Sequence, residues 1–207
     1  MHLSSIQRQF FKLLLAAFFL VTASSMSSQV APTTKGGATS QLAVGGGGSY
    51  FDVDWGRTRM VGYTVWADWR PPMLPHSLKG LNIEFEGRDV HWNPGDKPER
   101  FRETTGGGGL MYEWRQFKRF RPYAKGLMSL GSISFGHNLE PLGIRGYSHD
   151  TRTVYAPGGG IEYRVAGGLW ARADYEYQFW PGLLGGTLDP QGLTFGAMYD
   201  LTRGSWR

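Results

Sequence analysis

The sequence predicts an all-β fold: an eight-stranded antiparallel up-and-down β-barrel that spans a membrane. Three observations lead to this prediction. After about residue 45, stretches of roughly ten residues alternate apolar and polar side chains, as half-buried strands do. Turn signals separate these stretches, and none of them has the 3.6-residue period of an amphipathic helix. An export signal precedes them at the N-terminus.

The amino-acid composition also favours strands. The 207 residues include 31 Gly and no Cys, and 14% are aromatic. Aromatic side chains fit a pleated surface, whereas Gly weakens helices. The length suits a single domain, and the lack of Cys excludes a disulfide framework and thiolate metal sites.

Residues 1–25 are expected to be a signal peptide that is cleaved between about residues 23 and 31. Arg8 and Lys12 precede an apolar run over 13–21, and small residues follow it, which is the order of a secretory signal. The apolar run is about half of the roughly 20 residues that a spanning helix needs. A permanent membrane anchor is therefore the weaker interpretation.

The mature chain is expected to start with a flexible lead-in, residues 26–44, and to continue as a barrel over 45–207. Removing Arg8 and Lys12 lowers the formal net charge from +5 to +3. The remaining basic residues are scattered and do not form a stripe, so a nucleic-acid partner is not expected.

The barrel wall is expected to contain an even number of strands, as single-chain bacterial barrels do. Their approximate ranges are 49–55, 61–69, 81–86, 110–115, 122–134, 160–165, 169–179 and 193–201. Which residues of the strand at 122–134 face inward stays open, because Lys125 lies among small and apolar residues at both odd and even positions.

The connections fit an N-terminus on the periplasmic side. Long outer loops are expected at about 92–103, 136–150 and 181–190, and short periplasmic turns at about 116–120 and 166–168. Two connections break this rule: Gly56–Thr58 is short for an outer loop, and the Pro-rich 70–78 is long for a turn.

The apolar face of the strands is expected to contact lipid. A soluble barrel would bury that face, but the export signal and the aromatic residues near the strand ends favour a membrane. These interfacial aromatics are Trp55, Trp69, Trp114, Phe179 and Trp180.

The charged residues of the strands are then expected inside the barrel, where they must pair because an isolated buried charge is costly. The expected interior set is structural and consists of Asp52, Asp54, Asp68, Glu84, Glu86, Arg88, Glu113, Arg115, Lys125, Glu162, Arg164, Arg172, Asp174 and Glu176. An eight-stranded barrel leaves an interior that side chains can fill. Acids outnumber bases in this set, so a water-filled path would prefer cations.

The last strand carries the most specific motif of the chain. Thr194 is followed by Gly196, Tyr199 and Leu201 in the spacing of a barrel-insertion signal. On this motif and on its architecture, the chain resembles the outer-membrane β-barrel domain family, the small barrels similar to the transmembrane domain of OmpA. The resemblance implies recognition by the barrel-insertion machinery. The tail after Leu201 departs from the family pattern, since the chain ends in Arg.

Other motifs carry weaker hypotheses. The glycine runs at 45–48, 106–109 and 158–160 lack the Lys-Ser/Thr and the helix of a phosphate-binding loop, so they are expected to relieve crowding between strands. The four His residues after the signal have no metal-ligand spacing, and neither a metal nor a cofactor is expected. A lipid hydrolase would need Ser, His and an acid to converge; the candidates are Ser134, His137, Glu140, Ser148 and His149.

We therefore expect a protein of the Gram-negative outer membrane that is not an enzyme and that holds its outer loops on a structural barrel. Its expected partners are the outer-membrane lipids and, during assembly, the insertion machinery. A narrow passive channel is the first alternative, and a lipid-modifying enzyme is the second.

Overall fold

The computed structural model describes residues 41–53, 58–72, 74–75, 78–92, 101–134, 149–183 and 186–203. The expected signal peptide and most of the expected lead-in lie outside this part of the chain. No helix among the described residues is long and apolar enough to cross a membrane.

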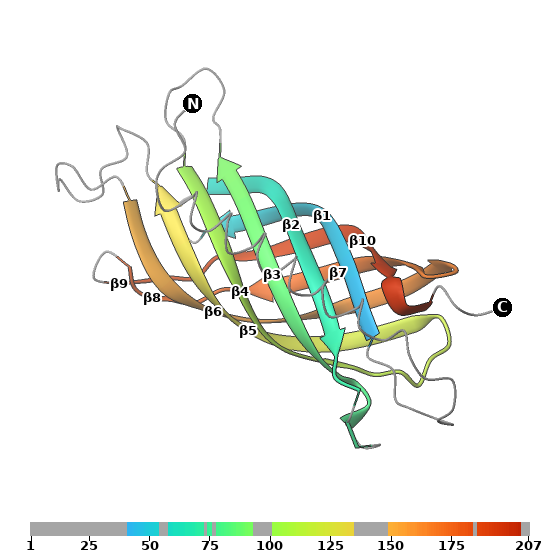
Figure 1. Ribbon diagram of the computed structural model, residues 1–207. Helices are drawn as coiled ribbons and strands as arrows, with labels where there is room; N and C mark the ends of the chain where they lie inside the picture. Colours follow the sequence, from blue (N-terminus) through green and yellow to red (C-terminus); the bar gives the residue numbers. More distant parts are fainter. Residues whose placement is uncertain are drawn as a thin grey trace, which may run out of the picture. The chain divides into compact units, whose positions relative to one another are not determined.

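Eight strands close into an antiparallel barrel, which confirms the predicted fold class (Figure 1). The strands are β1 (Gln41–Val53), β2 (Thr58–Arg70), β3 (Leu81–Trp92), β4 (Phe101–Glu113), β5 (Phe120–Ser134), β6 (His149–Ala166), β7 (Leu169–Tyr177) and β10 (Gln191–Asp200). Each pairs with the next barrel strand along the chain, and β1 pairs with β10 to close the ring. This is up-and-down topology.

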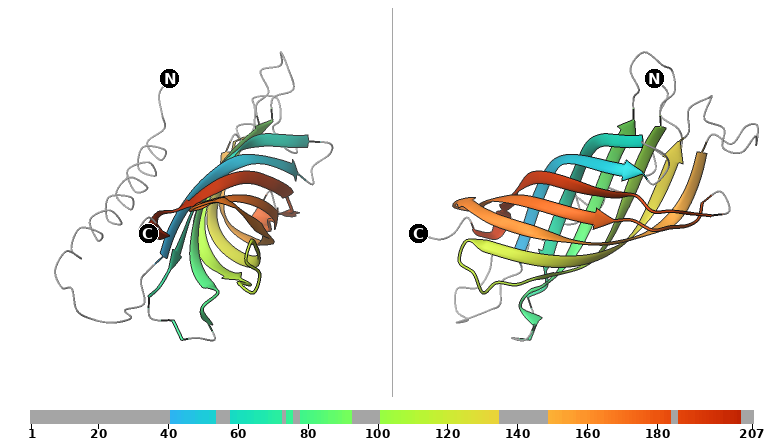
Figure 2. Two further views of the ribbon diagram at one scale, coloured as in Figure 1. Left: turned by 90° about the vertical axis from the view of Figure 1, so that its right-hand side faces the viewer. Right: turned by 180° about the vertical axis from the view of Figure 1, so that it is seen from behind.

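Two further strands form a separate hairpin between β7 and β10. They are β8 (Trp180–Leu183) and β9 (Gly186–Leu188). Figures 1 and 2 show this hairpin at one end of the barrel and the 3-10 turn that follows β10 at the opposite end. We call these the hairpin end and the turn end; the turn end also carries the connections 114–119 and 167–168.

Three strands begin long before the ranges that the alternation of the sequence indicates. β1 starts at Gln41, β4 at Phe101 and β6 at His149, where a lead-in and long loops are expected. The early part of β1 runs into the glycines 45–48, and the early parts of β4 and β6 are rich in Thr and charged residues, so the sequence pattern does not mark these parts as strands.

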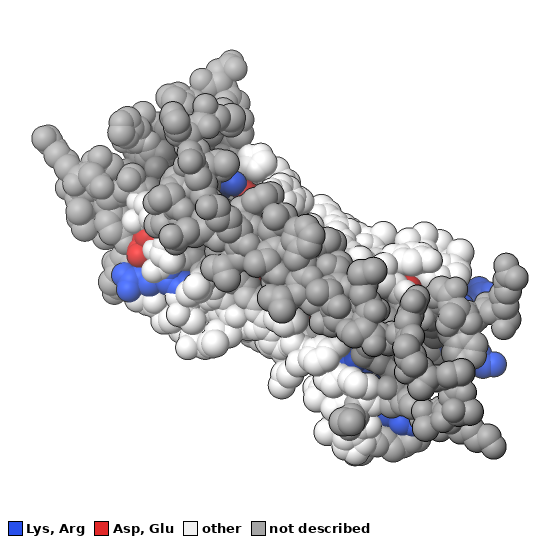
Figure 3. Space-filling view, in the orientation of Figure 1, with Lys and Arg blue, Asp and Glu red and all other residues white. Residues whose placement is uncertain are grey.

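The outside of the barrel is apolar over its middle. Outward side chains such as Tyr63, Phe85, Met128 and Phe195 are more than half exposed. Figure 3 shows charged residues near the two ends of the visible surface and uncharged atoms between them. In a membrane-spanning barrel this band faces lipid, because the strands alternate apolar side chains outward with polar ones inward.

Candidate functional site in the barrel interior

The inward side chains of the eight strands form a charged core inside the barrel. Among the described residues, nine acids and five bases are buried there. The acids are Asp68, Glu84, Glu86, Glu103, Glu113, Glu162, Asp174, Glu176 and Asp200. The bases are Arg70, Arg88, Arg121, Lys125 and Arg172. Charges in such surroundings are tolerable only where they pair and form hydrogen bonds.

Lys125 on β5 connects two strands that lie on either side of it. Its Nζ lies within 3.1 Å of a carboxylate oxygen of each of four acids. These acids are Glu84 and Glu86 on β3 and Asp174 and Glu176 on β7. One ammonium therefore compensates charge from both sides of the lumen.

Arg172 on β7 forms a second junction. Its guanidinium donates to Asp68 at 3.2 Å, to Glu84 at 2.7 Å and to Asp174 at 3.1 Å. Its Nε donates to the hydroxyl of Tyr123 at 2.7 Å. Four strands, β2, β3, β5 and β7, are joined through this one side chain.

Arg88 on β3 extends the network toward the hairpin end. It donates to Glu176 at 2.6 Å, to Glu86 at 2.6 Å and to the hydroxyl of Thr64 at 3.0 Å. Its guanidinium also lies 4.2 Å from the ring centroid of Phe51, which is the first residue of an apolar layer.

That apolar layer fills the lumen at the hairpin end. It consists of Phe51, Val53, Met60, Val90, Phe101, Ile133, Val154, Trp180, Leu183 and Leu188. The β8–β9 hairpin supplies the last three of these. We call this layer the apolar cap.

A smaller polar network lies toward the turn end. Arg70 donates to Asn82 at 2.8 Å, and Asn82 donates to Glu113 at 2.6 Å. Arg115 pairs with Glu113 at 2.8 Å, and Gln41 accepts a hydrogen bond from Arg70. A cluster of Trp66, Trp170 and Met198 forms a second apolar group in the lumen.

The structure buries most of the charges that the sequence assigns to the interior. The buried members are Asp68, Glu84, Glu86, Arg88, Glu113, Lys125, Glu162, Arg172, Asp174 and Glu176. Asp54 lies outside the described residues.

Three expected interior charges are exposed instead. Asp52 points outward because β1 buries Phe51 and Val53 in the apolar cap, so the polar residues of this segment take the outer face. Arg115 lies beyond the end of β4, and Arg164 lies beside a register shift in β6. The inward-outward alternation of the strand fails at both of these positions.

The sequence analysis missed interior charges at the margins of strands. Glu103 and Arg121 fall outside the ranges expected for their strands, and Arg70 follows directly after one. Asp200 is on the expected inner face but was not counted among the charges. Longer strand ranges would have found Glu103, Arg121 and Arg70, and the alternation of β10 already placed Asp200 inside.

Trp180 corrects the prediction of interfacial aromatics. It is fully buried in the apolar cap, whereas Trp69, Trp114 and Phe179 are exposed as expected. Trp55 lies outside the described residues. The indole of Trp180 donates to Gln178 at 2.8 Å, so even its polar atom has a partner inside.

Three buried acids are close enough together to bind a metal ion, but a lysine side chain lies between them. Oxygens of Glu84, Glu86 and Asp174 lie within 4.8 Å of one another. The ammonium of Lys125 contacts all three at 2.6 to 3.0 Å. It occupies the position that a metal ion would need.

The hydrolase candidates come together only in part. His149 lies at the start of β6 and is within 3.3 Å of the hydroxyls of Ser132 and Ser134, and within 3.2 Å of that of Thr151. His137, Glu140 and Ser148 lie outside the described residues. Among the described residues, the side-chain hydrogen bonds of His149 go to hydroxyls and to no carboxylate.

The residues of the expected insertion signal lie on β10 and directly after it. Thr194 faces the lumen and bonds to Ser49 at 2.8 Å. Tyr199 and Leu201 are exposed on the outside, where another protein can reach them. Gly196 pairs with Gly47 across the seam that closes the barrel.

Comparisons with solved structures identify the architecture. Neisserial surface protein A is similar with a TM-score of 0.56 and 16% identity, over 77% of this chain and 96% of that one. The outer membrane protein OprG from Pseudomonas aeruginosa gives 0.53 and 10%, over 82% and 99%. Ail, the attachment invasion locus protein of Yersinia pestis, gives 0.52 and 14%, over 78% and 97%.

This chain has the fold of the small outer-membrane β-barrels. No protein-family model and no curated protein sequence matches it. The architecture of the family that the sequence resembles is thus present in this chain.

Proposed function

We propose that this protein is a closed, non-enzymatic barrel of the Gram-negative outer membrane that anchors its connecting loops at the cell surface. One observation carries the proposal: inward side chains of facing strands contact one another across the lumen. Lys125 and Arg172 join acids on facing strands, and the apolar cap seals the hairpin end. A barrel held in this way does not need its loops for stability.

Support for the membrane location comes from the exterior. The exposed apolar band has no role in a soluble protein, where it would cause aggregation, but it fits the hydrocarbon core of a bilayer. The outward position of Tyr199 and Leu201 supports recognition of β10 by the insertion machinery.

Conductance of the purified protein in planar bilayers tests the closed state. A folded preparation, identified by its heat-modifiable migration on a gel, should give no steady current. As a loop control, replacing 136–147 by a Gly-Ser segment of equal length should leave that migration and the urea midpoint unchanged. A large loss of folded protein in this variant would show that the loop supports the wall.

The second candidate is a narrow cation channel, and the excess of buried acids favours it. Among the described residues, nine acids face five bases in the interior, and neither carboxylate oxygen of Glu162 has a hydrogen-bond partner there. Stable cation-selective openings that change in Glu176→Gln or Asp174→Asn would replace the closed-barrel proposal with this one.

A further inference from the structure

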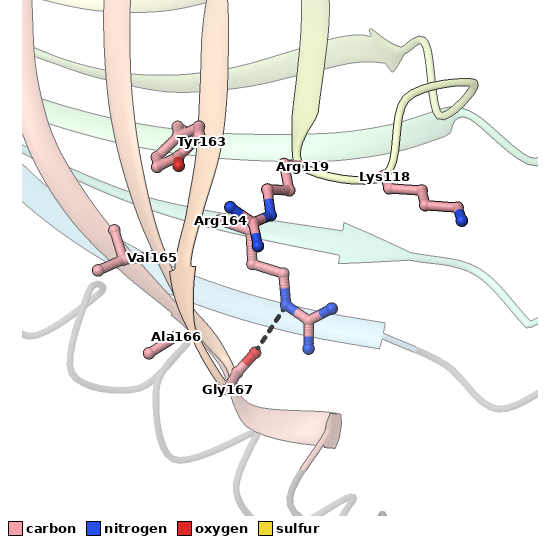
Figure 4. A pocket seen from close by; sticks show the side chains of 7 residues that line it. All are labelled: Lys118, Arg119, Tyr163, Arg164, Val165, Ala166 and Gly167. Atoms are coloured by element: carbon pink, nitrogen blue, oxygen red, sulfur yellow. Dashed lines mark hydrogen bonds between the residues drawn. The ribbon is translucent and has the colours of Figure 1, made fainter.

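A basic pocket lies on the turn end of the barrel, away from the lumen network. It has a volume of about 310 Å³ and lies between the connections 114–119 and 167–168. Its lining residues, drawn in Figure 4, are Lys118, Arg119, Tyr163, Arg164, Val165, Ala166 and Gly167.

The pocket has positive charge without an acid to compensate it. Three of its lining residues are basic and none is acidic. Among the residues that the structure describes, no salt bridge joins Lys118, Arg119 or Arg164 to a carboxylate. By contrast, two arginines near the hairpin end do pair with acids: Arg102 with Asp89 and Arg152 with Asp150.

The backbone fixes the two arginines beside each other. The amide of Arg164 donates to the carbonyl of Arg119 at 2.9 Å. The Nε of Arg164 donates to the carbonyl of Gly167 at 3.2 Å, the bond drawn in Figure 4. Its two terminal nitrogens are left for an external acceptor, and a guanidinium suits a phosphate because it can donate two parallel hydrogen bonds.

Apolar and aromatic side chains surround the pocket on the outer face. The rings of Phe120 and Tyr163 pack with centroids 5.0 Å apart. Phe117, Phe120 and Val165 are also exposed. Aromatic side chains next to basic ones are typical of the level where lipid headgroups meet the hydrocarbon core.

We propose that this pocket binds the phosphate group of an anionic lipid headgroup at the turn end of the barrel. Arg119 and Arg164 contact the phosphate, and the neighbouring aromatics contact the upper acyl chains. The inference rests on the proposed membrane location and adds a lipid site to it. A free phosphate ion could bind the same arginines, but it has no acyl chains to contact the neighbouring apolar side chains.

Native mass spectrometry of the folded, detergent-solubilised protein tests the site. Wild-type protein is titrated with phosphatidylglycerol, with phosphatidylcholine and with inorganic phosphate. The variant is Arg119→Gln with Arg164→Gln, and the matched control is Arg59→Gln with Lys79→Gln, which removes two exposed charges elsewhere. Heat-modifiable migration checks that each protein is folded, so loss of the barrel is distinguished from loss of the site.

We expect wild type and control to prefer phosphatidylglycerol over phosphatidylcholine, and the variant to lose affinity for it by about tenfold or more. Each basic side chain beside an anionic headgroup contributes roughly fivefold in affinity. Equal binding of the two lipids by wild type would overturn the proposal, as would an unchanged preference in the variant. Saturable binding of inorganic phosphate without a lipid preference would assign the pocket to a soluble anion instead.

Discussion

At the scale of single residues, the interior is organised by two cations with several carboxylate partners each. Alternation within β7 predicts that Arg172, Asp174 and Glu176 share the inner face, because every second side chain of a strand points the same way. The partners of Lys125 could not be predicted in the same manner. Glu84 and Glu86 lie 41 and 39 residues away in the chain, and only the pairing around the ring brings them to it.

Replacing Lys125 tests this organisation directly. Lys125→Met removes the ammonium from among four carboxylates, and removing one partner of a buried ion pair costs about 3–5 kcal/mol. We expect the urea midpoint of the folded barrel to fall accordingly, whereas Lys79→Met, at an exposed position, leaves it unchanged. Adding Glu86→Gln to Lys125→Met should restore part of the lost stability, because it removes one of the carboxylates left without a cation. Equal midpoints for the two single variants would mean that the network does not stabilise the barrel.

At the scale of elements, alternation identifies the two faces of a strand but not which face is inside. Polar side chains mark the inner face in the middle of this barrel and toward its turn end, but not in the apolar cap at the hairpin end. In β1 the rule reverses, because Phe51 and Val53 belong to the apolar cap. The cap also explains Trp180, because the other cap residues come from six barrel strands and from the β8–β9 hairpin itself. The local sequence of β1 or β8 does not indicate that the lumen changes from charged to apolar toward the hairpin end.

The seam between β1 and β10 depends on small residues. A Cβ on Gly47 would lie 2.3 Å from the carbonyl oxygen of Phe195, whereas a Cβ on Gly48 would meet nothing within 4 Å. Gly47→Ala should therefore force the closing strands apart and lower the heat-modifiable fraction after refolding. Gly48→Ala is the matched control and should refold like wild type. A normal yield for Gly47→Ala would show that the seam tolerates a wider spacing.

The hairpin β8–β9 contributes to stability through its buried face. Trp180→Ala removes a fully buried side chain from the apolar cap, and such truncations cost about 3–5 kcal/mol. We expect a clearly lower urea midpoint, together with an unchanged lack of conductance because the charged network still joins facing strands across the lumen. Phe179→Ala, at the neighbouring outward position, should have a much smaller effect. If both variants unfold at the same midpoint, the hairpin does not seal the barrel.

At the scale of the whole molecule, the apolar band and the closed ring make the chain a membrane-spanning barrel, and the two ends differ. The turn end carries the start of β1, the end of β10 and the connections 114–119 and 167–168. The hairpin end carries the connections 93–100 and 135–148 as well as β8–β9. The sequence predicts this asymmetry from connection lengths, apart from the short connection after β1 and the long one after β2, and it assigns the longer connections to the cell surface.

Cysteine labelling of whole cells tests that orientation. The chain has no cysteine, so a single introduced thiol is the only one in the protein. Thr187→Cys places it at an exposed position of β9 at the hairpin end, and Lys79→Cys places it at an exposed position between β2 and β3 at the turn end. A membrane-impermeant maleimide should label Thr187→Cys in intact cells and should label Lys79→Cys only after the outer membrane is permeabilised. The reverse pattern would put the basic pocket in the outer leaflet, where its lipid phosphate would come from lipopolysaccharide rather than from a phospholipid.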